Sequence, residues 1–282
     1  MRFRLPRRAD PLTHAGRWDS HAHVIDDPAR YPLSPTRAYE PPSAPLAAYL
    51  ALLDELGLTN GVLVQPSVYG FDNRCLLDAL DAGEGRLYGI AVPAPDSSTT
   101  DLETMNARGV RGVRCNLLDP HGLTVEQALR WQPVMRDLGW HVELHIAVER
   151  AGDLRAVVEP FEVPVVVDHM GRPAPGSADP SMPHLEALAA LVREGVCLVK
   201  LSAPYRLSAM PAPWDDVVPL ARALLAANAG ACMWATDWPH TDTRAPIAVA
   251  DLVRALVRWC PDDAVREGLT ARARNLFRPG QA

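Results

Sequence analysis

The chain has 282 residues, of which 48% are hydrophobic and 22% are charged, and its formal net charge is -6 at pH 7. These values describe an ordinary globular protein, and the negative charge argues against nucleic acid or an anionic membrane surface as the main partner. No apolar run reaches the roughly 20 residues that a membrane-spanning helix needs, and the Arg-rich start leads into no signal-peptide core. The sequence therefore predicts a cytoplasmic protein, and it leaves open whether the chain forms a homo-oligomer.

The chain begins with a basic, Pro-containing segment at 1–16, which we expect to be a poorly ordered arm or a cover for one end of the domain. A first strand is predicted at 19–25. The Pro-rich segment 26–45 that follows is too long for an ordinary turn. Loops of this length are uncommon in compact domains unless they are functional or disordered.

From residue 47 onward, short apolar runs alternate with helical stretches. Further strands are predicted at 61–67, 87–93, 112–117, 141–147, 163–168, 196–202 and 232–236, and helices at 47–56, 73–82, 98–107, from 124, at 149–158, 182–194 and 215–227, with two more at the end. Eight strands alternating with helices predict one distorted (β/α)8 barrel of the TIM type over residues 17–282. An open doubly wound sheet is the alternative, but no Gly-x-Gly-x-x-Gly follows the first strand.

Two histidines, His21 and His23, lie one residue apart on the first predicted strand. Side chains alternate along a strand, so these two would share one face and could meet one target. The alternative is that they are two unrelated loop histidines, because His-x-His is a short pattern. Other polar residues also follow the predicted strands, and they gather at the carboxyl ends: Gln65, Ser67, Arg114, Asn116, Glu143, His145, Asp168, His169, Lys200, Ser202, Tyr205, Arg206, Asp237 and His240. Barrel enzymes build their active sites at that rim, which predicts an active site there.

Several of these residues stand in motifs that resemble a known family. The motifs are Asp19-Ser20-His21-Ala22-His23, Asp168-His169-Met170-Gly171-Arg172 and Thr236-Asp237-Trp238-Pro239-His240, with Gln65-Pro66-Ser67, Arg111-Gly112-Val113-Arg114 and Lys200-Leu201-Ser202 between them. Together they resemble the amidohydrolase superfamily (amidohydrolase family 2). Within it they are similar to the branch containing 2-pyrone-4,6-dicarboxylate lactonase and 4-sulfomuconolactone hydrolase. The resemblance implies a hydrolase that opens the lactone ring of a small anionic compound with an activated water, in the degradation of aromatic compounds.

The resemblance also implies roles for single residues. Asp237 would be the general base that takes a proton from the attacking water. His21, His23 and His169 would steady the negative charge that develops on the carbonyl oxygen. A carboxylate or sulfonate of the substrate would be held by Ser67, Arg108, Arg114, Arg206 and Tyr39. Each arginine has a surface salt bridge as its alternative, and Arg111 competes with Arg108 for its role.

His145 departs from the lactonase pattern, in which the resemblance implies a tyrosine at this place and no metal. Metal-using amidohydrolases place a ligand histidine on that strand. A divalent ion, zinc or manganese, would then be bound by His21, His23, His145 and Asp237. The alternative is that no metal is bound and that His145 contacts the substrate.

Lys200 is the only lysine of the chain, and a buried pair with a carboxylate such as Glu143 is the favoured explanation for it.

Three other functions are alternatives to lactone hydrolysis. The first is a decarboxylase, because relatives with the same ligand set cleave carbon–carbon bonds. The second is a lactone isomerase, which is closer to the proposed hydrolase. The third, a barrel that only binds its ligand, is the non-enzymatic alternative.

Overall fold

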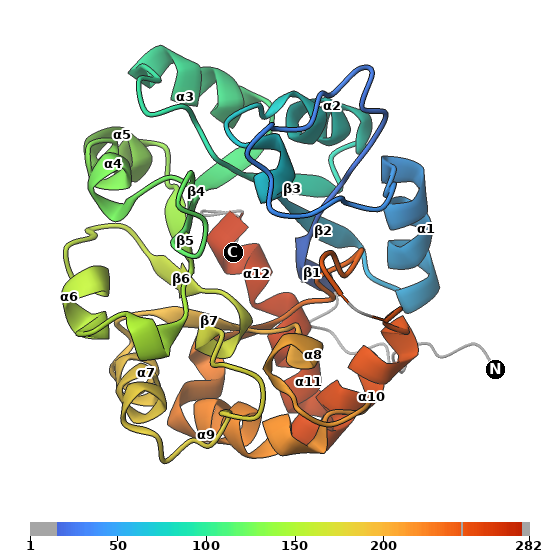
Figure 1. The fold of residues 1–282 in the computed structure, drawn as a ribbon, viewed down its shortest axis with the longest axis vertical. Coiled ribbons are helices and arrows are strands. Elements are labelled where there is room, and N and C mark those ends of the chain that lie inside the picture. Colours follow the sequence, from blue (N-terminus) through green and yellow to red (C-terminus); the bar gives the residue numbers. More distant parts are fainter. Residues whose placement is uncertain (1–15, 244, 278–282) are drawn as a thin grey trace.

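The computed structural model describes residues 16–243 and 245–277, which form a ring of eight parallel strands surrounded by helices (Figure 1). Each strand pairs with the next along the chain, in the order β1 to β8. The strands are β1 Trp18–Ala22, β2 Asn60–Val64, β3 Leu87–Ala91, β4 Val110–Asn116, β5 His141–His145, β6 Val165–Val167, β7 Leu198–Leu201 and β8 Cys232–Trp234. The predicted (β/α)8 barrel is therefore confirmed.

Helices cover the outside of the barrel, which explains why the strands are buried on both faces and rich in Val, Leu and Ile. The helices are α1 Leu46–Leu56, α2 Arg74–Ala82, α3 Thr99–Ala107, α4 Val125–Leu129, α5 Gln132–Asp137, α6 Leu154–Val158, α7 Pro183–Glu194, α8 Pro204–Leu207, α9 Val218–Asn228, α10 Val249–Trp259, α11 Asp263–Ala271 and α12 Ala273–Phe277. Within the described ranges, no helix is long and apolar enough to cross a membrane.

Two predicted helices are shorter than the sequence pattern indicated. The helix expected at 149–158 is split into a 3-10 turn, Val148–Arg150, and α6. Gly152 adopts a φ of +65° at the break, and the carboxylate of Asp153 then caps the new helix. The stretch that begins at Thr124 has a capping box with Gln127, but it is divided into α4 and α5.

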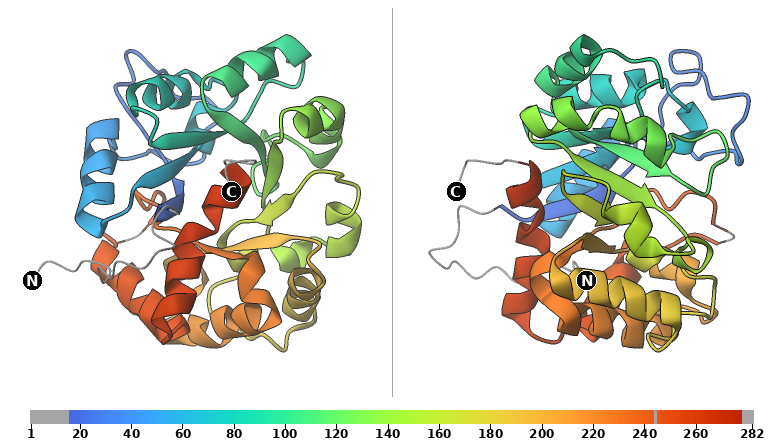
Figure 2. Two further views of the ribbon diagram at one scale, coloured as in Figure 1. Left: turned by 180° about the vertical axis from the view of Figure 1, so that it is seen from behind. Right: turned by 90° about the vertical axis from the view of Figure 1, so that its left-hand side faces the viewer.

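The bottom of the barrel, where the strands begin, is covered by the C-terminal helix α12 (Figure 2). Phe277 stacks on Trp18 with ring centroids 6.0 Å apart and meets the ring of His141 edge-on at 4.9 Å. The sequence analysis offered residues 1–16 as a cover for this end, and all but residue 16 lie outside the described part. Because α12 covers the bottom, the rim at the carboxyl ends of the strands is the accessible end of the barrel.

The segment 26–45 lies over that rim, on the side of the molecule opposite α12 (Figure 2). Its two ends are joined by an antiparallel bridge between Ile25 and Ala44. Tyr31 anchors it by donating a hydrogen bond of 2.9 Å to Asp78 on α2. The unusual length of this loop therefore reflects a position over the candidate site, to which it contributes Tyr39.

Candidate active site

The candidate site lies beside the seam where the barrel closes between β8 and β1. Among the described residues, no continuous ladder joins these strands, and one isolated backbone bridge connects Ala22 to Trp238, which follows β8. Asp19 strengthens the seam, because its buried carboxylate accepts from the backbone nitrogen and hydroxyl of Thr236, at 2.8 and 2.5 Å, and from Tyr49 at 3.1 Å. Burial raises the pKa of Asp19 to about 6, although these hydrogen bonds act in the opposite direction. The seam holds His21 and His23 next to the segment that carries Asp237.

Three histidines surround one oxygen of Asp237. Oδ1 lies 3.7 Å from Nε2 of His21, 3.6 Å from Nε2 of His23 and 3.8 Å from Nε2 of His169. The rings of His21 and His23 are 4.9 Å apart, so the two share a face as strand alternation predicted. Neither Oδ1 of Asp237 nor Nε2 of His21 has a hydrogen-bond partner among the described residues. Buried polar atoms without partners are rare in folded proteins, which marks this point as the place of a ligand.

The other oxygen of Asp237 is fixed by two donors from α8. Oδ2 accepts from the hydroxyl of Tyr205 at 2.5 Å and from Nε of Arg206 at 3.2 Å. Burial alone would raise the pKa of Asp237, but its electrostatic interactions with His169 and Arg206 lower the pKa well below the usual range. Asp237 is therefore ionised at neutral pH, and Tyr205, to which the sequence analysis assigned no role, contributes to the site.

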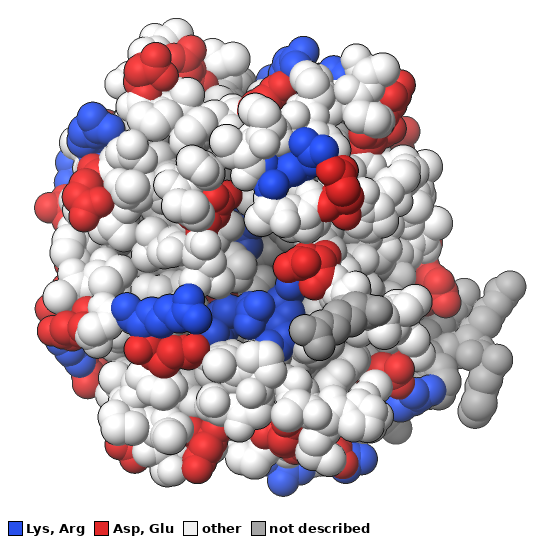
Figure 3. Space-filling model, viewed as in Figure 1, with Lys and Arg blue, Asp and Glu red and all other residues white. Residues whose placement is uncertain are grey.

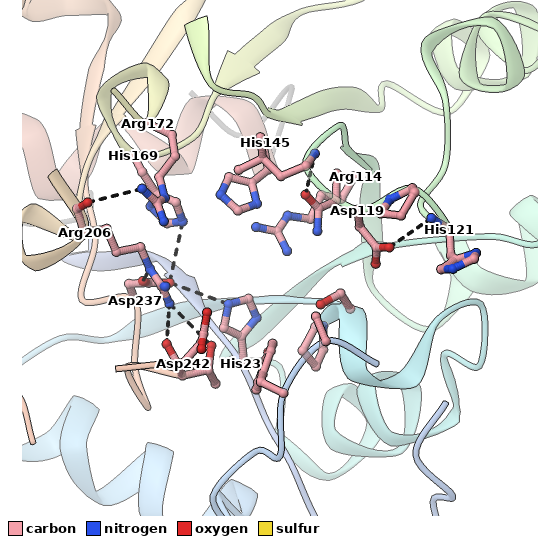
Figure 4. Close-up of a pocket in the computed structure, with 18 of the residues that line it drawn as sticks. His23, Arg114, Asp119, His121, His145, His169, Arg172, Arg206, Asp237 and Asp242 are labelled. Carbon is pink, nitrogen blue, oxygen red and sulfur yellow. Dashed lines mark hydrogen bonds and ion pairs between the residues drawn. The ribbon is translucent and has the colours of Figure 1, made fainter. Parts of the chain in front are cut away.

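His169 reaches the cluster through an unusual turn after β6. His169, Met170 and Arg172 adopt φ values of +52°, +53° and +52°, although none is glycine. The ring of His169 is also held by a 2.8 Å hydrogen bond between Nδ1 and the hydroxyl of Ser202. Residues other than glycine are strained in the left-handed backbone conformation, and such strain is found mainly at functional sites. This turn aims two side chains of one short segment, His169 and Arg172, into the pocket (Figure 4).

Beneath the histidines lies a fully buried cluster of charges. Lys200 donates to Oε1 of Glu143 at 2.5 Å, which confirms the predicted pair, and its Nζ lies 3.5 Å from Oδ1 of Asp168. Arg114 completes the cluster, with Nε 3.3 Å from Oδ2 of Asp168. Two cations thus face two carboxylates in the barrel interior, where unpaired charge would be strongly destabilising.

Lys200 and Asp168 favour different proton positions on His21. Nζ of Lys200 lies 3.0 Å from Nδ1 of His21, and an ammonium can only donate, so this contact requires the proton of the imidazole to be on Nε2. Oδ1 of Asp168, 3.4 Å away, would instead accept a proton from Nδ1. The contact to Lys200 is the shorter. This contact therefore assigns the proton to Nε2 of His21, which lies 3.7 Å from Oδ1 of Asp237.

The site opens into a pocket of about 380 Å³, and several histidines and arginines form part of its wall. Figure 3 shows the face of the molecule that carries it, with basic side chains gathered at the hollow in the middle. The pocket is lined by His23, Thr36, Ala38, Tyr39, Pro66, Ser67, Arg114, Asn116, Leu118, Asp119, Pro120, His121, His145, His169, Arg172, Arg206, Asp237, Thr241 and Asp242. Of the predicted substrate-binding residues, Ser67, Tyr39, Arg114, Arg206 and His145 are in this set.

Arg108 is not in the pocket. It caps the end of α3 and precedes β4, so it lies towards the opposite end of the barrel from the rim. Its guanidinium is paired there with Asp78 at 3.0 Å and Asp81 at 2.7 Å on α2. The salt bridge that the sequence analysis considered as an alternative is therefore the observed arrangement. Arg172, which the sequence analysis did not propose for the substrate, lines the pocket instead.

His145 lies apart from the other three predicted metal ligands. Within the described residues, His21, His23 and Asp237 bring ligand atoms within 4.8 Å of one another, and His145 is not part of that group. Its ring instead meets His169 edge-on, with centroids 5.2 Å apart, and Figure 4 shows it between His169 and Arg114. Neither of its ring nitrogens has a hydrogen-bond partner in the described part of the chain. This geometry fits a contact with the substrate better than the predicted fourth ligand.

The three remaining groups fit a divalent metal ion by the chemistry of their donors, which are two imidazoles and a carboxylate. Nδ1 of His23 lies 2.7 Å from the carbonyl oxygen of Val64, which can only accept. Nδ1 therefore carries the proton, and the lone pair of Nε2 is directed at the cluster. His21 would join as a ligand only after its proton moves to Nδ1, where Asp168 is the available acceptor.

Five histidines whose pKa is lowered by the protein interior predict a loss of stability in acid. Burial is the main cause that lowers the pKa of each below 6.5, to about 3 for His21 and about 4 for His240, with His141, His145 and His169 also lowered. The unfolded chain takes up these protons near pH 6.5 and the folded protein does not, so stability is fully present above pH 6.5 and falls as the pH drops. Each of these histidines lowers the free energy of unfolding by about 1.4 kcal/mol per pH unit below the pH at which it is protonated in the unfolded chain.

Urea unfolding of chelator-treated protein at pH 7.5, 6.5 and 5.5 would measure this effect. Asp19 has the opposite effect on stability in acid. Its carboxylate takes up a proton near pH 6 in the folded protein, but only near pH 3.8 in the unfolded chain. We expect a net uptake of several protons on unfolding at pH 5.5. A free energy of unfolding that stayed constant from pH 7.5 to 5.5 would contradict the prediction.

The fold and the site together define a barrel enzyme, because a pocket opens at the carboxyl ends of the strands and some buried polar atoms in its wall have no hydrogen-bond partner among the described residues. The amidohydrolase family matches residues 18–278, and the chain belongs to this family. It is 35% identical over 268 residues to the 4-sulfomuconolactone hydrolase of Rhizobium radiobacter, covering 92% of this chain and 89% of that protein. It is 32% identical over 256 residues to the 2-pyrone-4,6-dicarboxylate hydrolase of Comamonas testosteroni, covering 86% and 80%.

A solved structure extends the likeness to the fold. It is that of a probable 2-pyrone-4,6-dicarboxylic acid hydrolase of Acinetobacter baumannii with citric acid bound. The two chains superpose with a TM-score of 0.81 at 27% identity, covering 93% of this chain and 99% of that one. The protein is thus an enzyme of the amidohydrolase family whose relatives are named as hydrolases of lactone rings.

Proposed function

We propose that this enzyme hydrolyses the lactone ring of a small compound that carries carboxylate or sulfonate groups. The observation that carries the proposal is the position of three arginines, Arg114, Arg172 and Arg206, around the pocket that contains the partnerless oxygen of Asp237. Guanidinium groups suit planar and multi-oxygen anions, so the pocket combines anion binding with a carboxylate placed for catalysis. The names of the two relatives, a sulfonated lactone hydrolase and a pyrone dicarboxylate hydrolase, support the same substrate class.

In the proposed reaction, the lactone carbonyl lies among the histidines and a water lies beside Oδ1 of Asp237. The water oxygen attacks the carbonyl carbon while its proton passes to Asp237. His169 is neutral at pH 7, because burial lowers its pKa, and His21 presents the proton of Nε2. Such donors stabilise the negative carbonyl oxygen of the tetrahedral intermediate. The ring C–O bond then breaks, and Asp237 returns the proton to the departing ring oxygen.

Asp237 is a weak base, because its pKa is below the usual range, so the water needs further activation. We propose one divalent ion, zinc or manganese, held by His23, by Asp237 and by His21 once the Nε2 proton of His21 has moved to Nδ1. Bound there, the ion would make the water more acidic and would replace that proton in stabilising the carbonyl oxygen. Tyr205 and Arg206 contribute independently of the ion by fixing the carboxylate through Oδ2, which keeps Oδ1 directed at the histidines.

Hydrolysis of 4-sulfomuconolactone and of 2-pyrone-4,6-dicarboxylate in ¹⁸O-labelled water tests the function. We expect at least one of them to be opened with a gain of one water, and the label to appear in the new carboxylate because water attacks the carbonyl carbon. Release of carbon dioxide would instead identify a decarboxylase, and a product of unchanged mass would identify a lactone isomerase. Absence of turnover of both compounds would contradict the proposal.

Metal analysis of the same preparations tests the ion separately. Plasma mass spectrometry should find near-stoichiometric zinc or manganese in the wild-type protein. The structure predicts that His23→Ala loses this metal and that the matched variant His145→Tyr keeps it, because His145 lies outside the group of three ligands. Loss of metal in His145→Tyr would restore His145 as a ligand and contradict this assignment.

A further inference from the structure

Two side chains at the end of β7 each contact the Nδ1 atom of a histidine of the site. Nζ of Lys200 lies 3.0 Å from Nδ1 of His21, and Oγ of Ser202 lies 2.8 Å from Nδ1 of His169. Lys200 and Ser202 are two positions apart, so they share the inner face of the barrel, and both are fully buried. Lys200 assigns the proton of His21, and Ser202 stands in the equivalent place beside His169.

The direction of the hydrogen bond between Ser202 and His169 follows from the partners of the hydroxyl. If Nδ1 carried the proton, it would donate to Oγ, and the proton of the hydroxyl would need another acceptor. Among the described residues, Oγ of Ser202 has no second partner. A buried O–H group without an acceptor is costly, whereas a hydroxyl that donates to Nδ1 satisfies both groups. Ser202 is therefore the donor, and the proton of His169 is on Nε2.

The surroundings of Nε2 agree with this assignment. Nε2 of His169 lies 3.8 Å from Oδ1 of Asp237, an ionised oxygen that can only accept. His23 differs, because its Nδ1 donates to a backbone carbonyl and its Nε2 offers a lone pair. His21 also offers a lone pair once it turns to a divalent ion. His169 is therefore the histidine that keeps an N–H group at this point with or without an ion.

Ser202 also fixes the orientation of the ring. An imidazole ring can turn about its Cβ–Cγ bond, which would carry both nitrogens away from their present positions. The rings of His21 and His145 pack against His169 with centroids 4.8 and 5.2 Å away, but they form no hydrogen bond with it. In the described part of the chain, the hydroxyl of Ser202 is the one hydrogen-bond partner of this ring.

We propose that Ser202 is a positioning residue that holds His169 as an N–H donor towards the carbonyl oxygen of the substrate. Its hydroxyl donates to Nδ1, which keeps the proton on Nε2 and the ring in one orientation. A fixed donor at this place stabilises the negative oxygen of the tetrahedral intermediate. The inference rests on the proposed function for the role of His169 in catalysis. The position of the proton is a property of the resting protein, so it can be tested without a substrate.

Nitrogen NMR of the full-length protein with ¹⁵N-labelled histidine, at pH 7.5, locates the proton. The variant His169→Gln identifies the signals of His169 by their loss. In the wild-type protein we expect Nε2 to be the protonated nitrogen, both after chelator treatment and with added zinc. Ser202→Ala should move the Nδ1 signal downfield, because a lone pair that loses its donor is less shielded. Ser202→Thr keeps a hydroxyl and should keep the wild-type signal.

Steady-state kinetics with a lactone that the enzyme opens give the second readout. Ser202→Ala should lower kcat by about 3- to 10-fold, the effect of losing one neutral hydrogen bond. KM should change by less than about twofold, because the donor acts mainly in the transition state. Ser202→Thr should restore kcat. The matched control is Ser181→Ala, which changes an exposed serine in the loop between β6 and α7 and should leave kcat at the wild-type value.

A proton on Nδ1 of His169 in the wild-type protein would overturn the inference, and this result does not depend on the folding of any variant. An unchanged Nδ1 signal in Ser202→Ala, or a wild-type kcat in that variant, would also overturn it. If the expected spectra are found but no lactone is hydrolysed, the proposed function fails and the proton assignment stands. If a lactone is hydrolysed while Nδ1 carries the proton, the function stands and the role of Ser202 fails.

Discussion

Asp237→Asn is expected to lower kcat by about 10²- to 10⁴-fold, the usual contribution of a general base, and to leave the fold intact. Tyr205 and Arg206 both donate to Oδ2, so the carbonyl oxygen of the asparagine has to take that position. Its NH₂ group then replaces Oδ1 among the three histidines. An amide nitrogen cannot accept a proton, so the variant would keep the shape of the site and lose its base.

The experiment is a steady-state assay with the lactone that the wild-type enzyme opens, together with circular dichroism of the variant. Asp179→Asn is the matched control, because Asp179 is an exposed carboxylate outside the pocket, in the loop between β6 and α7. It should retain wild-type activity. A folded Asp237→Asn enzyme with more than about a tenth of the wild-type kcat would remove Asp237 from the role of general base.

Lys200→Met is expected to reduce the free energy of unfolding by about 3–5 kcal/mol, which is the usual cost of removing one partner of a buried ion pair. Methionine has a similar size, but it carries no charge. The two buried carboxylates of Glu143 and Asp168 would then have only the positive charge of Arg114 to compensate their negative charges. The variant should also lose the donor to Nδ1 of His21. Stability and the protonation of the site thus depend on the same side chain.

Urea unfolding at pH 7.5 measures this cost, with Arg136→Met as the control. Arg136 forms an exposed pair with Glu162, and removing such a pair costs only about 0–1 kcal/mol. The double variant Lys200→Met with Glu143→Leu removes both charges and should be more stable than Lys200→Met alone. If Lys200→Met were no less stable than Arg136→Met, the ion-pair cluster would not be important for stability.

The sequence by itself determined the number and order of the strands and the residues at their carboxyl ends. Alternation of strands and helices is a local pattern, and so is the period of two that placed His21 and His23 on one face. The pairing of Lys200 with Glu143 was also predicted, because a lone buried cation needs a carboxylate. These predictions required only the position of a residue along its own strand.

The tertiary structure decided which of these residues meet. Arg108 was expected to bind the substrate, but its place before β4 puts it near Asp78 and Asp81. Arg172 reaches the pocket through a left-handed turn of non-glycine residues, which no local pattern predicts. Whether His145 shares a ligand site with His21, His23 and Asp237 depends on where β5 stands in the ring of strands relative to β1 and β8. Such distances arise from contacts between residues far apart in the chain, and for that reason the sequence alone could not determine them.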